Sequence, residues 1–270
     1  MQTAGVLLLV AAASSSAQVT MSLVNPNDGA PGDQFCEYAG ISATLNNSTL
    51  ITAGADWIGI YEFDVEPNST PSISSPFYSV CLSPGGNLPA GDQVYDAETF
   101  AQANPGLNAP GTPGSWAYSG TSYYGVENAN YLFALYSTAI TAGDGQTMGL
   151  SGSEADQGAA LAMGMYAALY NSTAYGTLGG SAFVNTSTAE NVNTDYNDIL
   201  ETLNGSSAVA TAVQGTAGEV LVPENSGSQE FDFAGGGPPI IAPEPDSVIL
   251  ASLGSLLLAA WRLLALRRRL

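Results

Sequence analysis

The chain has 270 residues, 24 acidic side chains, four basic ones and no histidine, which gives a formal net charge of −20 at neutral pH. All four basic residues lie in positions 262–269, and only two acidic ones lie beyond residue 242, so residues 1–242 carry a side-chain charge of −22. This composition excludes nucleic-acid binding, because nothing neutralises phosphates. Without histidine or lysine, Ser-His-Asp or Cys-His catalysis, Schiff-base chemistry and histidine metal sites are excluded too. We expect no cofactor and no metal.

Residues 1–17 predict a signal peptide. An apolar run from Gly5 to Ala13 is too short to cross a bilayer, and Ser15 and Ala17 are small residues at the positions preferred before a cleavage site. We therefore expect cleavage after Ala17 and export of residues 18–234 as one acidic domain. The chain has 13 Tyr, 8 Phe and 3 Trp, all but Trp261 within this domain, which indicates a folded domain rather than a disordered acidic segment.

The first part of the domain predicts strands after an irregular start. Residues 18–40 are rich in turn formers, which indicates an irregular segment. Alternating hydrophobicity then predicts three strands, at residues 41–52, 56–66 and 76–82. The second strand alternates aromatic residues with Glu62, Asp64 and Glu66, a face that we expect to be solvated.

Two cysteines, Cys36 and Cys81, form an even pair in a chain expected to be exported. This predicts a disulfide between them, with two separate buried thiols as the alternative. Cys81 has no cationic neighbour in the sequence to lower its pKa, so we expect no reactive thiolate.

A long connection rich in proline and glycine follows, at residues 84–125, with a short helix predicted around residues 92–102. Its aromatic side chains could hold it against the domain and could contact a glycan. These side chains are Trp116, Tyr118, Tyr123 and Tyr124.

Helical periodicity predicts three helices, at residues 128–142, 153–170 and 187–203. Ser153 is an expected N-cap, and the helix after it is apolar nearly all round, which indicates burial. Ala160, Gly164 and Ala168 form a stripe of small residues that lets another element approach. The third helix is expected to begin with a capping box from Ser187 to Glu190.

Two closing strands are predicted at residues 209–222 and 230–234. The expected fold class is therefore α+β: an antiparallel sheet or sandwich with an inserted bundle of about three helices. One C-terminal transmembrane helix completes the prediction.

The end of the sequence has its own organisation. A linker at 235–242 leads to Pro243-Glu244-Pro245, then to an apolar run at 248–266 that reaches the roughly 20 residues a membrane helix needs. The basic residues come last: Arg262, Arg267, Arg268 and Arg269. Because positive charge beside a span stays cytoplasmic, we expect the domain to lie outside the membrane.

Residues 243–270 resemble the PEP-CTERM sorting signal of Gram-negative bacteria that make exopolysaccharide, on the Pro-Glu-Pro motif, the apolar run and the final arginines. The resemblance implies recognition by an exosortase, a membrane protease thought to cleave near the signal. It implies a protein held briefly in the inner membrane and then moved to the cell surface or extracellular matrix. An ordinary membrane anchor is the alternative.

Two further segments, from Phe77 to Cys81 and from Ala159 to Met165, more weakly resemble ectodomains of PEP-CTERM proteins and Gram-positive thioester domains. In thioester domains a strand cysteine bonds to a helix glutamine. Here Ala162 stands where that glutamine would fall, and Gln157 is more than a turn away. We therefore expect no internal thioester.

The leading interpretation is a non-enzymatic, exported surface or matrix protein associated with extracellular polysaccharide. One alternative is a carboxylate-dependent glycoside hydrolase or a glycan-binding module that uses the aromatic residues of the long connection. Another is a divergent thioester-type adhesin. Six Asn-x-Ser/Thr motifs leave glycosylation open. They begin at Asn46, Asn47, Asn68, Asn171, Asn185 and Asn204.

Overall fold

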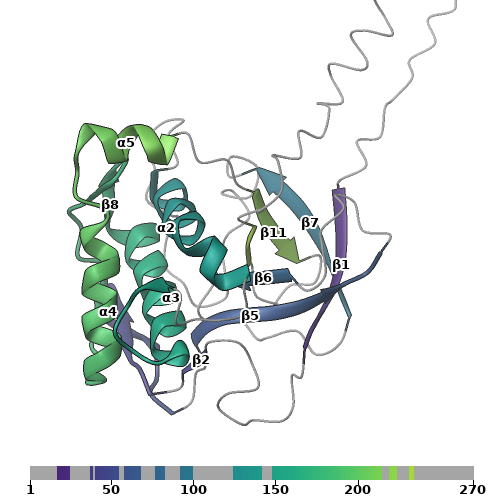
Figure 1. Ribbon diagram of the computed structural model, residues 1–270, viewed down its shortest axis with the longest axis horizontal. Helices are drawn as coiled ribbons and strands as arrows, with labels where there is room; N and C mark the ends of the chain where they lie inside the picture. Colours follow the sequence, from purple (N-terminus) through teal and green to yellow (C-terminus); the bar gives the residue numbers. More distant parts are fainter. Residues whose placement is uncertain are drawn as a thin grey trace, which may run out of the picture. The chain divides into compact units, whose positions relative to one another are not determined.

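The computed structural model describes ten stretches of the chain, all within one compact unit at residues 17–239. These are residues 17–24, 37–38, 40–54, 58–67, 77–82, 92–99, 124–141, 148–214, 219–223 and 231–233. They contain both strands and helices, so the expected α+β class is confirmed (Figure 1).

The largest sheet has seven strands in the order β12-β11-β7-β1-β5-β2, and β6 also pairs with β5. Every pairing in it is antiparallel, as predicted. The sheet curls until β12 lies beside β6. The strands are β1 (Ala17–Leu23), β2 (Glu37–Tyr38), β5 (Ile58–Val65), β6 (Phe77–Val80), β7 (Gln93–Thr99), β11 (Glu219–Pro223) and β12 (Phe231–Phe233).

β5 takes part in two hydrophobic cores. Its first residues, Ile58 and Ile60, belong to the larger core, which the helices share. Tyr61, Phe63 and Val65 belong to a second core, against one face of the curled sheet. Because strand side chains alternate between faces, one strand can supply both cores. Figure 1 shows β5 running from the helices into the sheet.

Four helices follow in the described part of the chain: α2 (Tyr124–Thr141), α3 (Glu154–Asn171), α4 (Glu190–Glu201) and α5 (Ser207–Gln214). They lie in sequence between β7 and β11, which are neighbours in the sheet, so the predicted insertion of a helical bundle is confirmed. About three helices were expected. The fourth, α5, was predicted as a strand.

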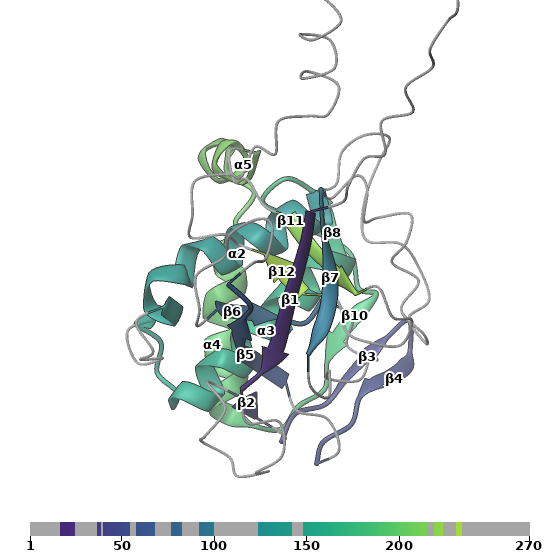
Figure 2. The ribbon, with the colours of Figure 1, turned by 90° about the vertical axis from the view of Figure 1, so that its right-hand side faces the viewer.

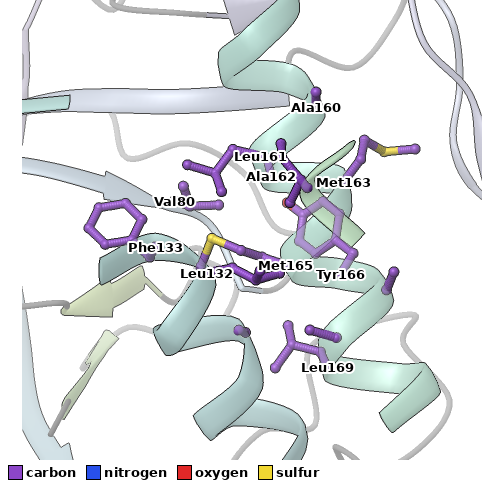
Figure 3. Packing of buried hydrophobic residues seen from close by; sticks show 14 of the residues in the cluster. Val80, Leu132, Phe133, Ala160, Leu161, Ala162, Met163, Met165, Tyr166 and Leu169 are labelled. Atoms are coloured by element: carbon purple, nitrogen blue, oxygen red, sulfur yellow. The ribbon is translucent and has the colours of Figure 1, made fainter. Parts of the chain in front are cut away.

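α3 is the centre of the bundle and packs against α2, α4 and β5. All its residues from Asp156 to Leu169 are buried, as its all-round apolar sequence predicts. Ser153 is its N-cap, in a capping box with Asp156. Figure 3 shows Met165 next to Leu132 of α2, near Val80 of β6 and Phe133 of α2, and Tyr166 beside Met163.

Two small sheets complete the described fold (Figure 2). One has three strands in the order β10-β3-β4, and the other pairs β8 with β9. Their bounds are β3 (Ala43–Leu45), β4 (Ser48–Ile51), β8 (Ser172–Ala174), β9 (Thr177–Leu178) and β10 (Phe183–Asn185).

Two predictions for the sheet were wrong. Residues 18–40 were expected to be irregular, but β1 covers the first of them, up to Leu23, because Val19, Met21 and Leu23 alternate into the second core. A helix was predicted around residues 92–102, but β7 is a strand that pairs with β1 on one side and β11 on the other. The buried Tyr95 anchors β7 in the second core.

Two strand predictions were wrong in part. The strand expected at 41–52 is a hairpin, because Asn46 and Asn47 turn the chain with φ of 51° and 65°, which asparagine tolerates better than most residues. Residues 209–222 were expected to form one strand, but α5 runs to Gln214 before β11 begins at Glu219. Its alanines favour a helix.

The capping box predicted at Ser187 is also wrong. α4 begins at Glu190 with Ala189 as N-cap, and no side chain caps it. The Ser187 hydroxyl instead accepts a hydrogen bond from the Ala189 N–H at 3.1 Å, in a turn before the helix.

Replacing Gly164 with leucine is expected to lower the free energy of unfolding by about 1–3 kcal/mol. A Cβ at Gly164 would lie 2.8 Å from Ile199 Cγ2, so Ile199 or the helix that carries it must shift to admit any larger side chain. Urea unfolding measures the change, with Ala208→Leu on the exposed side of α5 as the control. Equal stability of the two variants would contradict the close approach of the helices.

Candidate functional site

Most of the site residues predicted from sequence lie outside the described residues. These are the sorting motif Pro243, Glu244 and Pro245, the arginines Arg262, Arg267, Arg268 and Arg269, Cys36, and the aromatic residues Trp116, Tyr118 and Tyr123. The predicted membrane span at 248–266 is also outside them. Among the helices that are described, none has the length and apolar character needed to cross a membrane. Cys81 and Tyr124 are the predicted site residues with a described position.

Cys81 follows β6 and is buried, with 1% of its surface exposed. A hydrogen bond joins its side chain to that of Tyr166 on α3. Burial raises the pKa of the Tyr166 hydroxyl well above its ordinary value, and the neighbouring Cys81 and Tyr61 raise it further. Burial likewise raises the pKa of Tyr95, with a smaller contribution from Cys81. Cys81 thus lies among phenols, and the predicted disulfide to Cys36 stays a prediction.

The two segments of the thioester-like resemblance meet in the structure, but no acyl group faces the cysteine. Ala162 is one turn before Tyr166 on α3 and is fully buried. Gln157 lies nine residues before Tyr166, about 13 Å along the helix axis. Its Nε2 donates to the Gly152 carbonyl at 2.7 Å, away from the Cys81 end of the helix. The described geometry therefore offers no carboxamide to a thioester at Cys81.

The acidic face predicted on β5 is present. Asp64 and Glu66 are exposed, and Glu62 is half-buried. Across the ladder Asp64 lies opposite Ser22 and Glu62 lies opposite Tyr78. The expected solvation of this face is therefore confirmed at Asp64 and Glu66. In the described stretches, no three or more acidic or cysteine side chains are grouped so that they could hold a metal ion.

Tyr124, a predicted glycan contact, is half-buried at the start of α2. Its ring meets Tyr175 edge to face, with centroids 6.4 Å apart and planes at 84°. Next to them, burial raises the pKa of the Glu127 carboxyl, while a hydrogen bond with Tyr175 acts in the opposite direction. The structure therefore places Tyr124 in a packed cluster between α2 and the β8–β9 turn.

A buried carboxylate that sequence reasoning missed joins α4 to the start of α3. Asp195 is fully buried. Its Oδ1 accepts from the Ser151 N–H at 2.9 Å and the Ser151 hydroxyl at 2.8 Å, and its Oδ2 accepts from the Gly152 N–H at 2.9 Å. A Cβ at Gly152 would lie 2.5 Å from Asp195 Oδ2, so only glycine fits there.

Two asparagines, also missed, hold the segment after α3. Asn128 of α2 donates to the Ser172 hydroxyl at 2.7 Å and the Ala174 carbonyl at 3.0 Å, and accepts from the Gly176 N–H at 2.6 Å. Asn171 donates to the Phe183 carbonyl at 2.8 Å and accepts from its N–H at 2.9 Å. The available signal was an asparagine within an otherwise apolar helical pattern, which indicates a buried hydrogen-bonding role.

Alkaline pH is expected to unfold this domain. Burial raises the pKa of Tyr166, and it raises that of Tyr196 to about 12. The unfolded chain loses tyrosine protons from about pH 10 upward while the folded chain keeps them, so stability is full below that pH and falls above it. Ionisation of the buried tyrosines, followed by tyrosinate absorbance, should coincide with the loss of structure followed by circular dichroism. Ionisation of every tyrosine before any loss of structure would contradict this.

Comparisons with known proteins give one distant likeness. No family model matches the chain, and no curated protein does. Among solved structures, the chain is similar to the N-terminal thioester domain of fibronectin-binding protein SfbI from Streptococcus pyogenes. The identity is 14%, the match covers 79% of this chain and 99% of that chain, and the TM-score is 0.35. A likeness of this size carries no functional argument.

Proposed function

We propose that this chain is a non-enzymatic, exported protein of the cell surface or extracellular matrix, sorted by a PEP-CTERM signal at residues 243–270. Its partners are an exosortase-type membrane protease, the membrane itself before processing, and extracellular polysaccharide. The domain serves to present an acidic surface to the extracellular polysaccharide. Its charge keeps it soluble, and its C-terminal segment holds it in the membrane until the protease acts.

One observation carries the proposal, the distribution of cations. Residues 1–261 contain no lysine, arginine or histidine; Arg262 lies within the apolar run at 248–266, near its end, and the other three arginines follow it directly. Under the positive-inside rule this asymmetry directs the acidic domain outward. The Pro-Glu-Pro motif directly before the run adds the resemblance to a sorting signal.

The chemistry of the described residues supports a display role rather than the alternatives. Asp64 and Glu66 face solvent, Asp195 is held by backbone N–H groups and a hydroxyl, and Cys81 lies beside Tyr166. Tyr124 is half-buried and packs edge to face with Tyr175. None of these arrangements favours the hydrolase, the glycan-binding module or the thioester adhesin.

The test is intact mass and cell fractionation of the native protein, from cells with and without the exosortase-type protease. In the parent strain we expect an extracytoplasmic chain that has lost its first 17 residues and part of residues 243–270. Without the protease, the tail should remain and the chain should stay in the inner membrane. One unchanged mass in both strains, with the tail retained, would make this an ordinary membrane protein.

A matched pair of variants tests whether processing depends on the Pro-Glu-Pro motif or on any pair of prolines in this part of the chain. Pro243→Ala with Pro245→Ala changes the proposed signal and is expected to block processing. Pro238→Ala with Pro239→Ala changes the linker just before it and should leave processing intact. Protection of the domain from protease added to spheroplasts would contradict the outward orientation itself.

A further inference from the structure

The six Asn-x-Ser/Thr motifs become distinguishable once the fold is known. An N-glycan is built on the side-chain amide nitrogen of asparagine, and the motif needs a hydroxyl two residues later. A usable site must therefore expose the amide and leave both groups available. Five of the six asparagines are described, and Asn68 lies outside the described residues.

In two of the motifs, the side-chain amide of the asparagine is already hydrogen-bonded within the domain. Asn171 is 8% exposed, and both ends of its amide bond to the Phe183 backbone. Asn185 donates its Nδ2 to Asn193 Oδ1 at 2.8 Å, while its Oδ1 accepts from the Ser187 N–H at 2.9 Å. A sugar on either nitrogen would break these bonds.

The motif at Asn204 is exposed but engaged. Asn204 Oδ1 accepts from the Ser206 N–H at 3.0 Å, which fixes the side chain in a turn. The Ser206 hydroxyl, which the motif requires, accepts from the Val209 N–H at 3.3 Å at the start of α5. A transferase would have to compete with the cap of that helix.

Asn46 and Asn47 are different, because they form the tip of the β3–β4 hairpin (Figure 2). Both are exposed, with positive φ, and neither side chain has a hydrogen bond within the described stretches. Their partner hydroxyls belong to Ser48 and Thr49, which are exposed too. β4 is an outer strand of its three-stranded sheet as described, so the tip projects from an accessible edge.

We infer that this hairpin tip is an N-glycan acceptor site, with a lipid-diphosphate-linked oligosaccharide as the donor. The inference rests on the proposed export, since the donor must meet the chain outside the cytoplasm. The amide nitrogen of Asn46 or Asn47 forms a bond to the anomeric carbon of the first sugar. The bond from that carbon to the diphosphate oxygen breaks, the lipid diphosphate leaves, and the amide proton passes to a base of the transferase.

A glycan at this hairpin tip would protect the edge of β4 from pairing with another chain. A strand at the edge of a sheet can pair with another chain, and β4 carries no charged residue along Ser48–Ile51 to prevent it. A neutral, bulky sugar beside this edge blocks such pairing without adding to the repulsion within an already acidic domain.

The experiment is peptide mass mapping of the native protein with a glutamate-specific protease. Cleavage after glutamate puts Asn46 and Asn47 in residues 38–62, Asn171 and Asn185 in 155–190, and Asn204 in 202–219. We expect a glycan mass on the first peptide and none on the other two. An exported chain with no glycan, or a glycan on residues 155–190 or 202–219 in its place, overturns this inference and leaves the proposed function standing.

Ser48→Ala with Thr49→Ala removes both motifs and keeps the two turn-forming asparagines, so the hairpin is retained. This variant should lose the glycan, whereas Ser206→Ala should keep it. A purified assay tests the site independently of export: the full chain, an oligosaccharyltransferase and a lipid-diphosphate-linked oligosaccharide are mixed, and transfer to residues 38–62 is measured. No transfer there, while a short control peptide with the same motif is modified, overturns the inference.

Discussion

Replacing Asp195 with alanine is expected to lower the free energy of unfolding by about 2–4 kcal/mol, one of the larger effects of any single substitution in this domain. The carboxylate accepts three hydrogen bonds, from two backbone N–H groups and one hydroxyl of the Ser151–Gly152 segment. Alanine leaves those donors without their acceptor and leaves a cavity between α4 and the start of α3. Since a domain of this kind is stable by roughly 5–15 kcal/mol, the loss should be plain in urea unfolding.

Two further variants identify the cause. Asp198 is exposed on the same helix, so Asp198→Ala removes the same charge at no structural cost and should change stability by less than about 0.5 kcal/mol. Asp195→Asn keeps the shape but turns an N–H group toward the Gly152 or Ser151 donors. It should therefore be destabilising as well. If it were as stable as the parent, the carboxylate would not be needed as a double acceptor.

The parts of this fold that follow from local patterns could be predicted. β5 and β6 alternate clearly, and α3 is a long apolar helix with a serine cap, so all three were found close to their observed bounds. β7 was missed because its strand character depends on partners far away in sequence, such as Val19 opposite Tyr95. β1 was missed although Val19, Met21 and Leu23 alternate, because the turn formers after them suggested an irregular segment over residues 18–40. Short segments with few apolar residues are decided by tertiary pairing, which a single sequence does not contain.

Some features of the candidate site could likewise be predicted from the sequence, and others could not. The asymmetry of the arginines can be read from sequence because it is a property of order along the chain. The partner of Asn171 cannot be read from sequence, because Phe183 lies twelve residues on and meets it only after β8 and β9 turn the chain back. The six glycosylation motifs look alike in sequence, and only burial and hydrogen bonding separate Asn47 from Asn171.

The contrast between the exposed Asn47 and the buried Asn171 gives the second prediction of a large effect, in which the same substitution is made at both positions. Asn171→Asp is expected to lower the free energy of unfolding by on the order of 3 kcal/mol, and Asn47→Asp by less than about 0.5 kcal/mol. At Asn171 one oxygen can still accept from the Phe183 N–H, but the other replaces an N–H donor and faces the Phe183 carbonyl. A buried negative charge then lies against an oxygen. At Asn47 the side chain meets solvent.

The pH dependence of the Asn171→Asp deficit tests this reason. Burial and the facing carbonyl favour the protonated form, so the new carboxyl should have a higher pKa in the folded than in the unfolded chain. Below the ordinary aspartate pKa of about 3.9 it is protonated in both states and can donate to the Phe183 carbonyl, as the amide does. The deficit should therefore be small in acid, grow as pH rises through that value, and level off above the folded-state pKa. Unfolding free energies relative to the parent chain, measured at each pH, give the curve. A deficit that is the same at every pH would mean that lost packing, and not the carboxylate facing a carbonyl, destabilises the variant.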